Sequence, residues 1–135
     1  MLKFILYIIS LIKDPKTYKW AGVGLLALAG DYGLYNYLLG IIGMDLAKLC
    51  ATFVGVNISF NLNRIWTFKS NGTFFEDLKR YMALYLVAII VNVSVNNLAF
   101  RILEDIDLAY IAALFVSVII GYFGQRLWVF KNRTN

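Results

Sequence analysis

The sequence predicts an all-α membrane protein with four transmembrane helices, arranged as two tandem parallel-repeat hairpins, and a short interfacial helix before them. Composition is the first observation: 61% of the 135 residues are hydrophobic and only 16% are charged, whereas soluble domains are about half apolar and about a quarter charged. Segment length is the second, because a bilayer core about 30 Å thick requires about 20 apolar residues of helix. Segments of this kind occur at residues 20–43, 46–66, 78–100 and 108–130.

An internal repeat is the third observation. Residues 53–69 and 115–131 align without gaps, 62 residues apart, with 8 of 17 positions identical. In each copy an apolar run ends in the same basic and aromatic motif, R-x-W-x-F-K, at residues 64–69 and 126–131. The repeat predicts two related halves, each consisting of two helices.

The first 16 residues are predicted to form a separate amphipathic helix on the membrane surface. Their apolar run, residues 4–12, is too short to span a bilayer. It has no small-residue cleavage site and is followed by Asp14-Pro15-Lys16, which ends a helix. We interpret residues 1–16 as an interfacial anchor or a docking element for a partner. The membrane domain then covers residues 17–135, with its repeats at about 17–69 and 78–131.

Basic residues indicate the orientation. Eleven of the 13 lysines and arginines lie before the first span, at or near the connection between the second and third spans, or at and after the end of the fourth. The positive-inside rule therefore predicts a multi-pass protein of the cytoplasmic membrane with both termini in the cytoplasm. The two halves would then be parallel, related by an axis along the membrane normal. Anionic membrane lipids are sufficient partners for the basic excess, and since no solvated basic face remains, we expect no nucleic-acid partner.

The residue types present argue against catalysis and against bound metals. The chain has no histidine, which removes the commonest general base and metal ligand. Its single cysteine, Cys50, excludes an intramolecular disulfide and a multi-thiolate metal site. We therefore expect no enzyme activity, no catalytic residues, no metal and no cofactor.

Polar side chains inside the predicted spans are the candidate functional residues. Asp31 lies near the bilayer centre, where an aspartate costs about 2.5–3.5 kcal/mol to insert. It is either a structural aspartate bonded to an asparagine, or a functional carboxyl that binds a cation, a proton or sugar hydroxyls. The amides are expected to point at one another, as interhelical contacts or as a path for a polar substrate. The proposed polar path consists of Asp31, Asn57, Asn61, Asn63, Asn92, Asn96 and Gln125.

Arg64 and Arg126 occupy equivalent positions near the cytoplasmic boundary. A guanidinium at this depth either binds a substrate phosphate bidentately or anchors the helix to lipid phosphates. On helical spacing Arg64 shares one face with Asn57 and Asn61. The neighbouring aromatic residues are predicted to lie at the headgroup level: Trp66, Phe68, Trp128 and Phe130.

The four-span layout, the duplication and the segment Asn61-Leu-Asn63-Arg64-Ile-Trp66-Thr67-Phe68 resemble the GtrA-like family over about residues 18–131. These are small membrane proteins of cell-surface polysaccharide and teichoic acid glycosylation. The resemblance implies a role in moving polyprenyl-phosphate-linked sugar between leaflets, or in supporting the glycosyltransferase of the same pathway. The N-terminal extension departs from shorter members, so the resemblance implies nothing about it.

Our leading hypothesis is membrane translocation (flipping) of a polyprenyl-phosphate-linked sugar. The arginines would receive the phosphate, and the polar path would meet the sugar. Because four helices are narrow for a hydrated sugar, a homo-oligomer with its path at the subunit interface is a further expectation. The alternatives are a membrane scaffold that recruits a polyprenyl-phosphate glycosyltransferase, and a small proton-coupled cation exporter that uses Asp31.

Overall fold

The computed structural model describes residues 2–132, in which every regular element is helical. Met1 and residues 133–135, including Arg133 of the basic residues after the fourth predicted span, lie outside the described part. The chain divides into two compact units, Met1–Lys69 and Ser70–Asn135. The elements are α1 (Leu2–Lys13), α2 (Pro15–Ile42), α3 (Met44–Leu62), η1 (Asn63–Thr67), α4 (Phe74–Leu103), α5 (Ile106–Gly124) and η2 (Gln125–Val129).

Within residues 2–132, three helical segments are long and apolar enough to cross a membrane: Pro15–Ile42, Phe74–Leu103 and Ile106–Val129. Few of their apolar residues are buried inside the protein, so these surfaces require lipid. The predicted second span, α3, does not reach the same apolar content. Its 19 residues include Asp45, Lys48, Asn57 and Asn61, which lower its hydropathy. The structure therefore supports three of the four predicted spans on length and composition.

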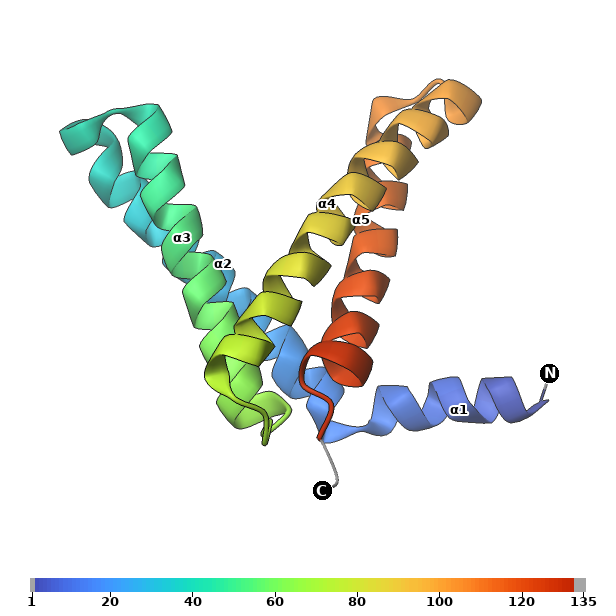
Figure 1. Ribbon diagram of the computed structural model, residues 1–135. Helices are drawn as coiled ribbons and strands as arrows, with labels where there is room; N and C mark the ends of the chain where they lie inside the picture. The colour runs from blue at the N-terminus through green and yellow to red at the C-terminus, as the bar shows by residue number, and fades with distance from the viewer. Residues whose placement is uncertain (1, 133–135) are drawn as a thin grey trace. The chain divides into compact units, whose positions relative to one another are not determined.

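In the first unit, α2 and α3 lie side by side and form the first helix pair (Figure 1). Gly43 joins them with φ of 82°, a left-handed conformation that favours glycine. Small residues one helical turn apart let the helices approach closely. A Cβ at Gly55 would stand 3.1 Å from the carbonyl oxygen of Ala27 and from Cβ of Asp31. The buried residues of this pair include Val23, Ala27, Ala47, Ala51 and Gly55.

In the second unit, α4 and α5 form the second helix pair in the same manner (Figure 1). Ala109 and Ala113 are buried, and they lie 62 positions after Ala47 and Ala51. A Cβ at Gly124 would clash with the side chain of Leu84, so this glycine also marks a close approach. Within each pair, small residues thus allow the two helices to pack closely.

Polar caps fix where the helices begin. Asp14 accepts a hydrogen bond from the Lys16 amide at 2.8 Å, and Pro15 occupies the first turn of α2, where its missing N–H costs nothing. Thr73 caps α4 by accepting from the Glu76 amide, and Asp105 caps α5 by accepting from the Leu108 amide. These caps stabilise the helix starts because the first N–H groups of a helix lack partners within it.

Each of α3 and α5 continues into a five-residue π-helix that contains the repeated motif. The Phe68 amide donates to the Asn63 carbonyl, and the Phe130 amide donates to the Gln125 carbonyl, both at 2.9 Å. A π-helix has i→i+5 bonds and is common at functional sites. The regular α-helical spacing therefore ends at Leu62, and the shared face of Arg64 with Asn57 and Asn61 stays a prediction.

Candidate functional site

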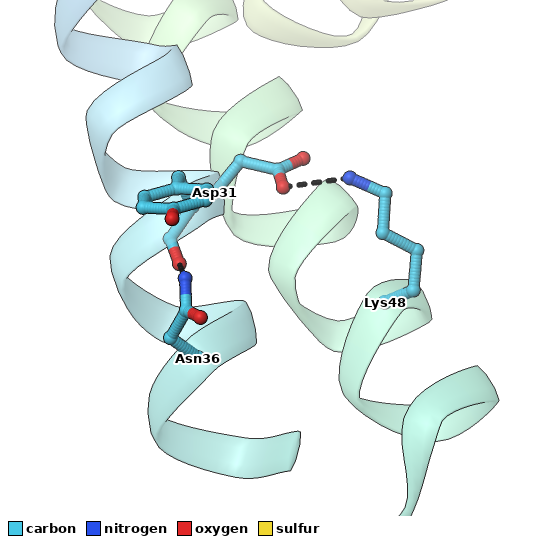
Figure 2. Close-up of polar contacts among 4 residues, drawn as sticks. Asp31, Asn36 and Lys48 are labelled. Atoms are coloured by element: carbon cyan, nitrogen blue, oxygen red, sulfur yellow. Dashed lines mark hydrogen bonds and ion pairs between the residues drawn. The ribbon is translucent and has the colours of Figure 1, made fainter.

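Asp31 forms an ion pair with Lys48 across the first helix pair. The Lys48 Nζ lies 2.8 Å from Asp31 Oδ1, and Figure 2 shows the two side chains pointing toward each other from α2 and α3. The carboxyl of Asp31 is therefore bonded to a lysine rather than to an asparagine. Lys48 is not among the predicted site residues, although it lies within the second predicted span, residues 46–66. An opposite charge on the facing helix was the signal available in the sequence.

The ion pair is half-buried and asymmetric. The side chain of Lys48 is 59% exposed and that of Asp31 only 18%, because α3 approaches Asp31 closely at Gly55. The Lys48 ammonium also lies 5.8 Å from the ring centroid of Tyr35, within the range of a cation–π contact. Asn36 does not join this group, since its amide donates to the Tyr32 carbonyl of its own helix at 2.7 Å (Figure 2).

The second helix pair has a polar contact at the equivalent level. Asp31 lies eleven residues before the end of α2 at Ile42, and Asn92 lies eleven residues before the end of α4 at Leu103. The residues opposite are equivalent too, since Gly55 and Ser117 each lie eleven residues after the start of their helix. Asn92 Nδ2 donates to Ser117 Oγ at 2.8 Å. This bond agrees with the expectation that deep amides make interhelical contacts.

The amides of Asn57 and Asn61 on α3 bond within their own helix. Asn57 Nδ2 donates to the Phe53 carbonyl at 2.7 Å, and Asn61 Nδ2 donates to the Asn57 carbonyl at 2.9 Å. The expectation that these amides point at other polar side chains is therefore wrong. A carbonyl one turn back is always within reach of a short amide, whereas a partner on another helix is not. The two side chains instead line an open hollow with Ile58 and Leu62.

Two predicted path residues are buried at the start of the π-helices. Asn63 is 1% exposed and Gln125 is 7% exposed. Asn63 Nδ2 donates to Ser59 Oγ at 3.4 Å, but its Oδ1 and the Oε1 of Gln125 have no hydrogen-bond partner. A path for a substrate needs accessible groups, so these two positions do not serve one in this conformation. Asn96, the remaining amide, is half-buried on α4.

In each helix pair, a basic residue near the start of the first helix, α2 or α4, contacts a tryptophan of the repeated motif. Lys19 Nζ lies 5.2 Å from the ring centroid of Trp66, and Arg80 Nη1 donates to the Trp128 carbonyl at 3.4 Å. Counted back from the ends of α2 and α4, Lys19 and Arg80 are equivalent residues. Each helix pair therefore places two basic residues near its motif, since Arg64 and Arg126 lie within the motifs themselves.

The arginines and aromatic residues of the motif differ in exposure. Arg126 Nη1 donates to the Tyr122 hydroxyl at 2.6 Å, and its guanidinium lies 5.8 Å from the centroid of the same ring. Arg64 is half-buried. Trp66 and Trp128 are exposed, as residues at a headgroup interface should be, whereas Phe68 and Phe130 are buried. The two phenylalanines therefore pack in the protein core, and their position at the headgroup level stays a prediction.

Residues 19–134 match the family model described as GtrA/DPMS, transmembrane domain. The chain belongs to the GtrA/DPMS family. The match begins at residue 19 within α2, includes the rest of both helix pairs and both π-helices, and leaves out α1. GtrA/DPMS membership indicates a membrane protein involved in handling phosphoprenol-linked sugars, in a family whose members are generally non-enzymatic. No curated protein matches the sequence.

Proposed function

We propose that this GtrA/DPMS protein translocates a polyprenyl-phosphate-linked sugar across the cytoplasmic membrane for glycosylation of cell-surface polysaccharide. One observation carries the proposal. In each helix pair, the residue eleven positions before the end of the first helix makes a polar contact with the second helix, Asp31 with Lys48 and Asn92 with Ser117. Polar and charged groups inside a membrane are costly and usually mark the route of a polar substrate. A protein that served only as an anchor would not need them in both halves.

The proposal includes a topology of four spans, with two parallel hairpins and both termini in the cytoplasm. α3 and η1 supply 19 and 5 residues, a length of about 36 Å at about 1.5 Å per residue, which is enough to cross a bilayer. The 62-residue offset between α3 with η1 and α5 with η2 supports a duplicated hairpin. In that topology the turns at Gly43 and Glu104 lie outside, and the motifs lie at the cytoplasmic face.

The basic residues near the motifs would receive the lipid phosphate. Guanidinium groups bind phosphate oxygens bidentately, and Arg64 and Arg126 each have a second basic residue nearby on the preceding helix, Lys19 and Arg80. The sugar hydroxyls would meet the accessible amides, and the prenyl chain would stay in lipid along the exposed apolar faces of α2 and α4. The substrate would come from a glycosyltransferase of the same pathway, and a homo-oligomer would widen the route.

The test is transport of a fluorescent polyprenyl-phospho-sugar in proteoliposomes. We expect the double variant Arg64→Ala with Arg126→Ala to transport at least about tenfold more slowly, because a charge-assisted hydrogen bond contributes about 1.5–3 kcal/mol. Arg101→Ala is the matched control, since Arg101 lies in the last turn of α4, far along that helix from Arg80. Equal rates for the double variant and the wild type would remove the phosphate role of the two arginines.

The exporter alternative is disfavoured by the ion pair. A proton-coupled cation site needs a carboxyl that its substrate can reach, but the Asp31 carboxyl is bonded to Lys48 and covered by α3 at Gly55. The scaffold alternative has one observation in its favour. α1 exposes apolar side chains that a lipid surface or a partner protein would cover: Leu6, Tyr7, Ile9 and Ile12.

A further inference from the structure

Eleven residues before the turn, the two helix pairs make polar contacts of different kinds, one between neutral groups and one between charged groups. The second pair uses neutral groups, with Asn92 bonded to Ser117. The first pair uses the carboxylate of Asp31 beside Gly55 and adds the ammonium of Lys48. The residue 62 positions after Lys48 is Tyr110, so the second pair has no counterpart of this ammonium. Helix packing at this level does not require an ion pair, and the charges of the first pair therefore point to a ligand.

The geometry indicates the sign of that ligand's charge. The Lys48 side chain is 59% exposed, whereas Asp31 is 18% exposed and its Oδ2 lies 3.6 Å from the place of a Cβ on Gly55. An ammonium has three N–H donors, and the bond to Asp31 Oδ1 uses one of them. An anion can therefore reach the ammonium of Lys48 and accept hydrogen bonds from its other N–H groups. A cation would meet the same positive charge in front of a covered carboxylate.

We propose that Lys48 binds the phosphate group of the substrate at the turn end of the first helix pair. Asp31 holds the ammonium while no phosphate is present. When phosphate arrives, it binds the remaining N–H groups of the ammonium and weakens the bond to the carboxylate, so Lys48 keeps an anionic partner throughout. Lysine is a common phosphate ligand because it is a compact point charge. This inference rests on the proposed function. It adds a second phosphate position at the start of α3, whereas Arg64 lies beyond the end of that helix.

Cys50 provides the reporter for a binding test. It is the only cysteine, it is exposed, and it lies two residues from Lys48. The protein would be labelled at Cys50 with an environment-sensitive fluorophore, reconstituted in nanodiscs and titrated with a polyprenyl monophosphate. A parallel titration with inorganic phosphate shows whether the site takes the lipid or the free ion. The variants are Lys48→Gln, Lys48→Arg, Asp31→Asn and the double variant Asp31→Asn with Lys48→Gln.

The two partners of the ion pair should give opposite results. Lys48→Gln and the double variant should bind at least about tenfold more weakly, because a charge-assisted hydrogen bond is lost. Lys48→Arg should retain binding. Asp31→Asn should bind as tightly as the wild type or more tightly, because the carboxylate no longer competes. The double variant leaves neither charge unpaired, so it gives the result even if Lys48→Gln fails to fold.

Equal weakening by Asp31→Asn and Lys48→Gln would overturn the inference and assign the pair to structure alone. Unchanged binding by the double variant would also overturn it. If the wild type transports the sugar but the label at Cys50 responds to neither phosphate, only this inference fails. If the wild type neither binds the polyprenyl phosphate nor transports the sugar, the proposed function fails and this inference fails with it.

Discussion

Asp31 is tolerated inside an apolar helix because α3 provides for it in two ways. Lys48 neutralises its charge at 2.8 Å, and Gly55 provides the space in which the two helices approach at this level. Burying a charge without a partner costs far more than burying a pair. The neighbours of Asp31 are thus as important for the membrane insertion of α2 as the apolar residues around it.

At Gly55, we expect a larger side chain to separate the helices. Gly55→Val should destabilise the protein by about 1–3 kcal/mol, the usual cost of overpacking, because even a Cβ would stand 3.1 Å from the Ala27 carbonyl and from Asp31. The measurement is reversible unfolding in detergent micelles. Gly33→Val is the control, since nothing lies within 4 Å of a Cβ at Gly33. Equal stability of the two variants would show that Gly55 is not a close contact.

The partners of polar side chains were only partly predictable from the sequence. The cost of inserting an aspartate predicted that Asp31 would be shielded from lipid, and it is half-buried and paired. The sequence pattern could not decide which partner it has, because a long lysine reaches across the helix pair from nearer the turn. The same limit applies to Asn57 and Asn61, which bond to their own backbone.

The helices themselves follow from apolar runs, caps and turn residues. Asp14 and Pro15 separate α1 from α2, and Gly43 and Glu104 end α2 and α4, all at positions that the sequence marks as breaks. The π-helices were not predictable from periodicity, since they differ from an α-helix by one residue per hydrogen-bonded turn. Their only sequence signal is that the same motif appears at both, at residues 64–69 and 126–131.

α1 can be tested as an element by deleting residues 2–13. If α1 serves only as an interfacial anchor, transport in proteoliposomes should remain within about twofold of the wild type. The reason is that α1 contributes little to the first unit beyond its junction, where the Thr17 hydroxyl donates to the Leu11 carbonyl. Loss of pathway activity in cells, with transport in vesicles unchanged, would instead support a scaffold that recruits a glycosyltransferase through α1.

At the scale of the whole molecule, the duplication determines the expected topology. Cysteines introduced at Asp45 and Asp107, in a Cys50→Ser background, should react with a membrane-impermeant thiol reagent from outside the cell. A cysteine at Asn71 should react only after the membrane is opened. All three positions are exposed in the structure, so their reactivity reports their side of the membrane. Labelling of positions 45 and 71 from the same side would show that α3 does not span, and would exclude two parallel hairpins.

Because so little of their apolar surface is buried, the three candidate spans in the described part of the chain depend on lipid or on further copies of the chain for their environment. The proposed function gives the polar contacts and the basic motifs one common explanation, in which a polar headgroup passes along helices whose apolar faces stay in lipid. Helix packing explains the small residues but not the ammonium of Lys48 or the paired basic residues at each motif.

The decisive measurement is the rate at which liposomes containing the purified protein translocate a fluorescent polyprenyl-phospho-sugar, compared with a fluorescent phosphatidylethanolamine in the same vesicles. We predict rapid movement of the polyprenyl-phospho-sugar, well above that in protein-free liposomes, and no acceleration of the phosphatidylethanolamine. A polyprenyl-phospho-sugar rate equal to that of protein-free liposomes would contradict translocation by this protein.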